Sequence, residues 1–233
     1  MKGSDLEVIW GTLSRSGSQF VLGLTTRLLG SKLQPQSRIS GVRKEGYQHR
    51  EPSFHELYAN GSGVEYFTRH EIRSLKLEDP CNDGFGEVVA DAFPDARWVT
   101  SIRPIDDVLT SHFNIKRWGH DETYVLRSYR RNLELFERLS EEERLAPIRV
   151  DEPASFDPAR FAGFFGVPPS QAFLKAVEDW TPINDLRYQK DKWDEAYDGV
   201  PSLPPDLDTL RDRHPWLEDV EARYDDLVVR FWE

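Results

Sequence analysis

An Arg-Ser-Gly-Ser segment near the N-terminus has the residue types that bind an anion, at Arg15, Ser16, Gly17 and Ser18. Arginine presents a planar fork of donors, glycine allows a ligand close to the backbone, and the serines add hydroxyl groups. The segment joins a predicted strand to a predicted helix, where backbone N–H groups and the helix dipole favour negative charge. By itself the signal is weak, because ordinary tight turns use the same residues.

A second pair of candidate donors follows the stretch 97–102, which predicts another strand. Arg103 directly follows this stretch, and Ser111 stands eight positions later, which is about two helical turns. Donors at two neighbouring strand–helix junctions would hold a ligand that is anionic at both ends. Asp106 and Asp107 suggest a metal pair, but they are better interpreted as first-turn acids that complement the helix dipole.

The elements that must position these residues alternate along the chain. Hydrophobic patterning predicts strands at residues 6–12, 72–77, 97–102 and 147–150, and helices at 20–30, 84–93, 108–115, 122–139, 157–165 and 215–232. Residues 31–62 are polar and broken by glycine and proline, which predicts mostly loop. This alternation predicts an α/β fold of three α/β/α layers around a mostly parallel sheet, in a single domain over 1–233.

The composition excludes several classes of binding partner and site. The chain has 233 residues and a formal net charge of −11, which argues against binding a nucleic-acid backbone. A single cysteine, Cys81, excludes an internal disulfide and a cysteine-rich zinc site. The chain has no apolar run long enough to span a membrane and no signal-peptide pattern, so we expect a cytoplasmic protein. The sequence has no evident acidic metal cluster, so we expect no bound metal. The oligomeric state stays open.

Two other site types fit poorly. A nucleotide triphosphatase loop needs G-x-x-x-x-G-K-[ST], but Gly11 and Gly17 are one position too far apart, and Ser18 stands where the lysine belongs. The neighbours Ser111 and His112 suggest a hydrolase, but no nucleophile elbow surrounds them.

Together the two donor segments resemble the sulfotransferases that use 3′-phosphoadenosine 5′-phosphosulfate (PAPS). In that family the first loop reads [KR]-S-G-[TS]-T-W, which residues 15–20 match except at Gln19 and Phe20. The spacing of Arg103 and Ser111 matches the family's 3′-phosphate site, and residues 93–97 resemble its F-P-x-A-[RK] lead-in. The resemblance implies a P-loop-like sulfotransferase architecture. It also implies that residues 15–20 bind the 5′-phosphosulfate and that Arg103 and Ser111 bind the 3′-phosphate.

Weaker similarities suggest the catalytic groups. Residues 76–80 resemble the family's K-T-H-x-P segment, which implies that Lys76 neutralises the transferring sulfonate and that Glu78 is the general base. Glu51 is the second candidate for the base and His70 the third. As alternatives, Lys76 and Glu78 form a solvated pair on an edge strand, and Glu51 and His70 are ordinary surface residues. Residues 149–166 resemble the family's R-Y-E-D-L, D-P and F-L-G region. The family's late R-K-G loop is absent, and residues 187–190 are the nearest basic stretch.

The function implied is transfer of a sulfuryl group from PAPS to a hydroxyl or amine by in-line displacement, with Arg15 stabilising the leaving group. The acceptor is a small molecule, lipid or carbohydrate, and residues 31–69 and 189–205 are expected to border its pocket. The net negative charge mildly disfavours polyanionic acceptors, although a local basic patch would override it. The alternatives are a P-loop nucleotide kinase and a non-catalytic nucleotide-binding protein of the same fold.

Overall fold

The computed structural model describes residues 6–13, 16–30, 37–39, 73–78, 85–113, 122–180 and 207–233. Its strands form one parallel sheet in the order β2-β3-β1-β4-β5. Their bounds are β1 Val8–Thr12, β2 Ser37–Ile39, β3 Ser74–Glu78, β4 Arg97–Ile102 and β5 Leu145–Arg149. Every residue of the central β1 is buried, because a parallel sheet is covered on both faces.

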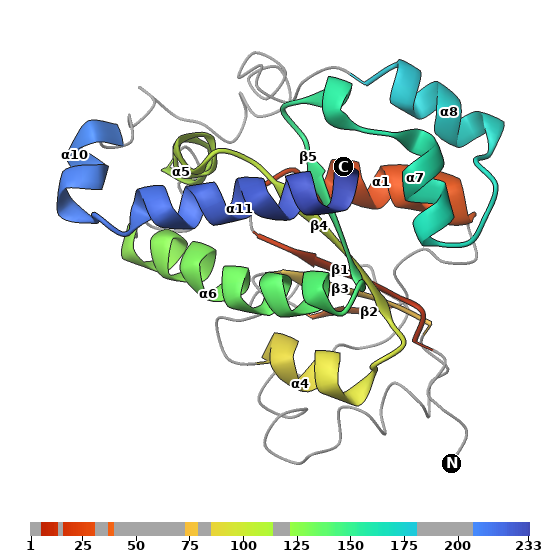
Figure 1. Cartoon of the computed structure of the whole chain (residues 1–233), viewed down its shortest axis with the longest axis horizontal. Helices are drawn as coiled ribbons and strands as arrows, with labels where there is room; N and C mark the ends of the chain where they lie inside the picture. Colours follow the sequence, from red (N-terminus) through yellow and green to blue (C-terminus); the bar gives the residue numbers. More distant parts are fainter. Residues whose placement is uncertain are drawn as a thin grey trace, which may run out of the picture.

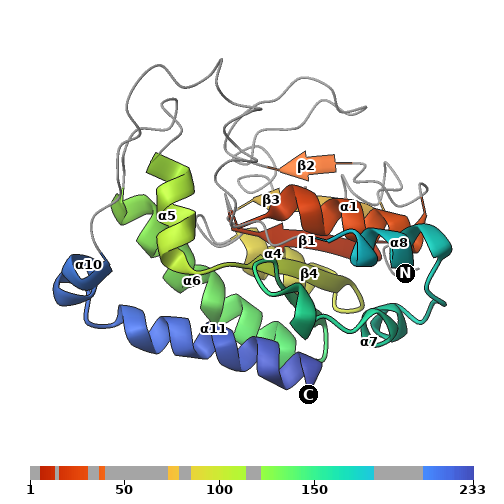
Figure 2. The same cartoon turned by 90° about the horizontal axis from the view of Figure 1, so that it is seen from above.

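Helices cover both faces of this sheet (Figures 1 and 2). On one face, β1 packs through Val8 and Trp10 against α1 (Ser18–Leu29), α7 (Pro158–Phe164) and α8 (Gln171–Glu178). On the other face, Ile9 belongs to a hydrophobic core that also contains residues from helices. These helices precede β4, join β4 to β5, or follow β5 in the sequence. These helices are α4 Phe85–Ala92, α5 Ile105–Phe113, α6 Glu122–Glu141, α10 Leu207–Arg213 and α11 Leu217–Trp232. The three-layer α/β/α prediction is confirmed.

Local sequence signals account for several boundaries. Helix α1 ends at Gly30, as predicted from its glycine. Asp157 caps α7, because its side chain accepts hydrogen bonds from the N–H groups of Ala159 and Arg160, and Pro158 occupies the first turn. Both features agree with the sequence prediction for this helix.

Two short elements depart from the sequence predictions. Strand β2 lies within residues 31–62, which were expected to be mostly loop, and helix α10 lies where the sequence pattern predicted no helix. A three-residue strand shows no alternating pattern, and within the part of the chain that the structure describes its backbone pairs with β3 alone. Helix α10 has seven residues and is anchored by Leu210, which is fully buried in the core. Both elements therefore depend on tertiary contacts rather than on local pattern.

The order of the strands fixes where a ligand would bind. After β1 the chain crosses to β2 and β3 on one side, whereas after β4 it continues to β5 on the other side. The crevice outside the carboxyl ends of β1 and β4 is therefore the topological switch point, where open α/β sheets bind ligands. The segments that follow these two strands contain both of the predicted donor motifs.

Within the described residues, no helix is long and apolar enough to cross a membrane.

Candidate functional site

A direct hydrogen bond joins the segments that leave β1 and β4. The Oγ atoms of Ser16 and Ser101 lie 2.5 Å apart, and both side chains are buried. The Ser16 hydroxyl donates to the carbonyl oxygen of Leu13 at 2.7 Å. Because a hydroxyl has only one hydrogen, Ser101 must be the donor in the contact with Ser16. The two switch-point segments are thereby held in one geometry.

Ser16 is also held by its main chain. Its backbone N–H also donates to the Leu13 carbonyl, at 3.3 Å. With both groups bonded inside the protein, Ser16 fixes the shape of this turn, and its predicted role in binding a ligand stays a prediction.

Gly17 occupies a position that suits glycine on two grounds. Its φ of 96° lies in the left-handed region, which side chains with a Cβ rarely adopt. A Cβ at Gly17 would also approach both Cγ atoms of Val150 to 3.1 Å. Val150 directly follows β5, so the turn after β1 is packed against the end of a third segment. The approach of the Gly17 backbone to a ligand stays a prediction.

Helix α1 begins with its positive end uncompensated by the described residues. Phe20 and Val21 donate their N–H groups to the carbonyl of Gly17, so the N–H groups of Ser18 and Gln19 precede the first hydrogen bond of the helix. Within the described residues, no side chain caps this terminus, and its first turn contains no acidic residue. Backbone dipole and exposed donors at this end favour an anion.

Lys76 lies beneath this helix terminus. Its side chain is 0% exposed, at the middle of β3 and opposite Trp10 of β1. Its Nζ donates to the Ser18 hydroxyl at 3.4 Å. The alternative of a solvated pair on an edge strand is wrong for Lys76, because β3 is flanked by β2 and β1. A buried ammonium beside the positive end of a helix adds positive charge at this site, which favours a bound anion.

Arg103 is nearly as buried, at 2% exposure, and lies where β4 leads into α5. Its Nε forms an ion pair with Asp107 Oδ2 at 3.3 Å. Burial raises the pKa of the Asp107 carboxyl, Arg103 opposes this shift, and the charges of Asp106 and Asp151 add to it. Asp106 and Asp107 lie in the first turn of α5, as predicted. Among the described residues, no group of three or more His, Cys, Asp or Glu is arranged to hold a metal ion.

Several predicted site residues lie wholly or partly outside the described residues. Arg15, Glu51 and His70 lie wholly outside the described residues. The backbone of Glu78 ends β3 opposite Thr12, and the backbone of Ser111 belongs to α5, but their side chains are not described. The basic stretch 187–190 also lies outside the described residues.

The last two positions of the first motif lie on the opening turn of α1. Gln19 is exposed, and Phe20 is half-buried. The Phe20 ring packs against Trp180, with ring centroids 4.6 Å apart. Trp98 and Trp180 are both buried in the core.

Two residues that line the switch point were missed by the motif analysis. Ser101 ties the two segments together, and Thr12 ends β1 on the same face as Lys76. The Thr12 hydroxyl is buried and has no hydrogen-bond partner among the described residues. A buried orphan hydroxyl in this crevice is a group that a bound ligand would satisfy. Their position at strand ends was the signal that could have identified them.

Comparisons with known proteins give a likeness at the level of structure. No protein-family model matches the chain, and no curated protein matches its sequence. Among solved structures, the chain is similar to retinol dehydratase in complex with androsterone and the inactive cofactor PAP, with a TM-score of 0.47 and 12% sequence identity. The match covers 99% of this chain and 82% of that chain. Similarity at this level leaves the function to be inferred from the chain's own residues.

Proposed function

We propose that the protein is a sulfotransferase that uses PAPS as its sulfuryl donor. The observation that carries the proposal is the burial of Lys76 beneath the N-terminus of α1, where backbone donors and an ammonium converge. The Ser16–Ser101 hydrogen bond connects this anion site to the segment that holds Arg103. The crevice thus offers one anion site at the end of β1 and a guanidinium at the end of the neighbouring β4, which suits a donor with phosphates at its 5′ and 3′ positions.

The proposed roles follow from these positions and from the motif resemblance. The N–H groups of Ser18 and Gln19, with Arg15, would bind the 5′-phosphate and stabilise charge on the leaving group. Lys76 would neutralise the transferring sulfonate. Arg103 and Ser111 would bind the 3′-phosphate, which distinguishes PAPS from ATP. Phe20 lies on the opening turn of α1, directly after Ser18 and Gln19.

The reaction is an in-line displacement at sulfur. A hydroxyl or amine of the acceptor attacks the sulfur atom, and the bond from sulfur to the 5′-phosphate oxygen breaks. The acceptor proton passes to a general base, for which Glu78 at the end of β3 is the first candidate, followed by Glu51 and His70. The products are a sulfated acceptor and 3′-phosphoadenosine 5′-phosphate. The acceptor is proposed to be a small molecule, lipid or carbohydrate.

The test is thermal unfolding with 3′-phosphoadenosine 5′-phosphate, ATP or AMP, followed by transfer assays with PAPS and a panel of alcohols and amines. A ligand that binds only the folded state at 100 times its Kd adds about 2.7 kcal/mol to stability. We expect the bisphosphate to stabilise the protein more than ATP or AMP does. We also expect Arg103→Gln to reduce its effect to that of AMP.

Each other outcome has a definite meaning. Equal stabilisation by ATP would favour the nucleotide kinase. Tight binding of the bisphosphate without turnover on any acceptor would favour a non-catalytic nucleotide-binding protein. No stabilisation by any of the three nucleotides would overturn the proposal.

A further inference from the structure

An ion pair joins Arg103, directly after β4, to Asp107 in the first turn of α5. The Arg103 Nε–H donates to Asp107 Oδ2 at 3.3 Å. The side chain of Arg103 is 2% exposed, whereas that of Asp107 is 31% exposed. Because the guanidinium is buried, water and salt screen this pair less than they screen the exposed ion pairs that contribute little to stability.

The backbone on both sides of this pair is held by hydrogen bonds. The carbonyl of Ile102 accepts the N–H of Val150 at 3.1 Å, which fixes the chain directly before Arg103. Pro104 has a restricted φ, and its carbonyl accepts a backbone hydrogen bond of 3.1 Å that closes the first turn of α5. Side chains of a helix tilt toward its N-terminus, which directs the Asp107 carboxylate back toward Arg103. With the backbone held, the remaining freedom of Arg103 is in its side chain.

The contact with Asp107 restricts that side chain and is compatible with phosphate binding. It engages Nε–H, whereas the two terminal nitrogens of a guanidinium can bind a phosphate as a pair. A guanidinium has five N–H donors, so it can bind a carboxylate and a phosphate at the same time. An arginine that is already ordered loses less entropy when its ligand binds.

Asp106, the neighbour of Asp107, provides an internal comparison. Both acids lie in the first turn of α5, and both are half-buried. Both charges complement the helix dipole, and both repel a phosphate. Among the described residues, Asp107 is the one of the two that forms an ion pair with Arg103. An effect of Asp107 that Asp106 lacks therefore comes from this contact.

We propose that Asp107 is a positioning residue, which holds the Arg103 guanidinium in the orientation that binds the 3′-phosphate of the nucleotide. The acceptor oxygen of Asp107 performs this role, and its negative charge is not required. The inference rests on the proposed function, because it concerns the nucleotide site assigned above.

The test is calorimetric titration of the full chain with 3′-phosphoadenosine 5′-phosphate and with AMP, which differ only in the 3′-phosphate. The ratio of the two affinities measures how well the protein recognises that phosphate. We expect Asp107→Ala to lower this ratio by roughly three- to tenfold, the range for ordering one long side chain on binding. The affinity for AMP should stay unchanged, because AMP has no 3′-phosphate for Arg103 to bind.

Two further variants separate positioning from charge and from folding. Asp107→Asn keeps an acceptor oxygen, so we expect the ratio to return at least to the wild-type value. In the Arg103→Gln background, Asp107→Ala should have no further effect on the ratio, because Asp107 acts through Arg103. Thermal unfolding without ligand checks that each variant folds.

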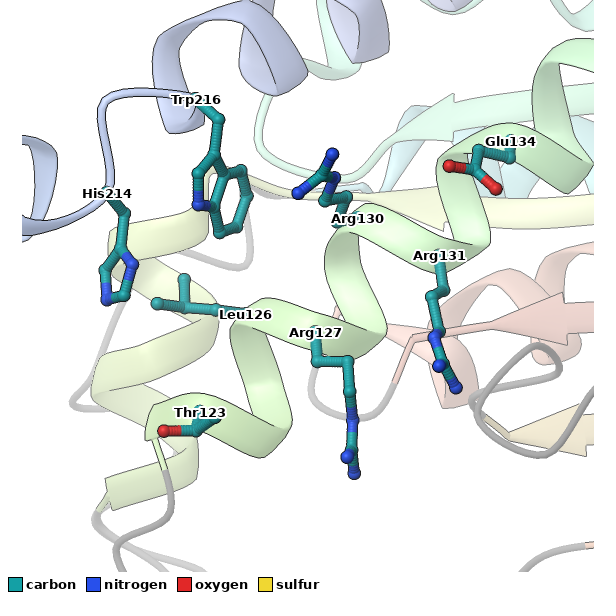
Figure 3. Close-up of a pocket in the computed structure, with 8 residues that line it drawn as sticks. All are labelled: Thr123, Leu126, Arg127, Arg130, Arg131, Glu134, His214 and Trp216. Atoms are coloured by element: carbon teal, nitrogen blue, oxygen red, sulfur yellow. The ribbon is translucent and has the colours of Figure 1, made fainter.

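Two acid-to-alanine variants are the controls. Asp106→Ala removes the same charge from the same turn of α5, and its ratio should equal or exceed the wild-type value. Glu134→Ala removes an exposed carboxylate of α6. Glu134 lines a pocket that neither Arg103 nor Asp107 lines (Figure 3), so the ratio should equal that of the wild type.

The outcomes separate this inference from the proposed function. If the wild type does not prefer the bisphosphate to AMP, both fail. If it does and Asp107→Ala keeps that preference, the inference alone is wrong. An equal loss in Asp107→Asn, an equal loss in Asp106→Ala, or a further loss in the Arg103→Gln background would also overturn it.

Discussion

The hydroxyl oxygens of Ser16 and Ser101 lie 2.5 Å apart, although 85 positions separate the two serines in the sequence. One serine belongs to the turn between β1 and α1, and the other lies near the carboxyl end of β4. Their hydrogen bond therefore connects the first donor motif to the strand that carries Arg103. In the proposed function, this contact sets the distance between the two protein segments that bind the ends of the nucleotide donor.

Replacing Ser101 tests that connection. Ser101→Ala removes a buried donor, and we expect it to lower the free energy of unfolding by about 1 kcal/mol. We also expect weaker binding of 3′-phosphoadenosine 5′-phosphate, because a hydrogen bond no longer holds the two segments to each other. Denaturant unfolding and nucleotide titration measure the two effects. Ser128→Ala is the control, since it removes a buried hydroxyl bonded to Asn132 within α6. If both variants lose nucleotide affinity equally, the connection has no special role.

Gly17 offers a test of backbone geometry. Gly17→Ala forces a Cβ into the left-handed region and toward Val150, at 3.1 Å from its Cγ atoms. We expect a loss of about 1–3 kcal/mol in unfolding free energy from the backbone alone. Adding Val150→Ala should recover only the part due to the contact, which denaturant unfolding of the double variant measures.

Gly163→Ala is the matched control for that prediction. Gly163 lies in α7, and a Cβ there would meet nothing within 4 Å. We expect this change to be neutral or to stabilise the protein by up to about 1 kcal/mol, since alanine favours helix. If Gly17→Ala behaves like Gly163→Ala, the account of the turn given above is wrong.

Replacing Lys76 is expected to affect the stability of the fold and the affinity for the nucleotide differently. Lys76→Met replaces a fully buried ammonium by an apolar side chain of similar length. Without ligand we expect Lys76→Met to remain folded, because methionine is apolar and fills a similar space. We expect affinity for 3′-phosphoadenosine 5′-phosphate to fall at least tenfold, about 1.4 kcal/mol.

The control for this change is Lys175→Met, at an exposed lysine of α8 that pairs with Asp179. Its nucleotide affinity should equal that of the wild type. Unfolding of Lys76→Met, or wild-type binding by it, would contradict the role assigned to the ammonium.

The raised pKa of the Glu221 carboxyl predicts that the free energy of unfolding depends on pH. Burial raises the pKa of its carboxyl above the ordinary value, although a hydrogen bond and the charge of Arg211 oppose this. The folded state therefore binds the proton more tightly, and the stability from the protonated form is lost as pH rises through the folded pKa. Glu221→Gln stays neutral, so its melting temperature relative to the wild type should increase from about pH 4 to pH 7. Glu141→Gln, at an exposed position of α6, should show no such trend. A constant difference between Glu221→Gln and wild type over this range would contradict the prediction.

Local patterns predicted most of the sheet because its strands are short apolar runs with clear ends. Strands β1 and β4 were found within a residue or two of their predicted bounds, since both have mainly buried residues between polar turns. Helix α6 was predicted from its apolar stripe. Strand β2 and helix α10 carry too few residues for a pattern, so only their partners fix them.

The sequence by itself determined the alternation of strands and helices, and it located an Arg-Ser-Gly-Ser turn and Arg103 after separate strands. Only the tertiary structure decided that these strands are neighbours, that Ser16 turns inward to Ser101, and that Lys76 lies buried beneath α1. The physical reason is that hydrophobic periodicity and turn chemistry are local. The order of strands, and the burial of a charge among them, depend on contacts between residues far apart in the chain.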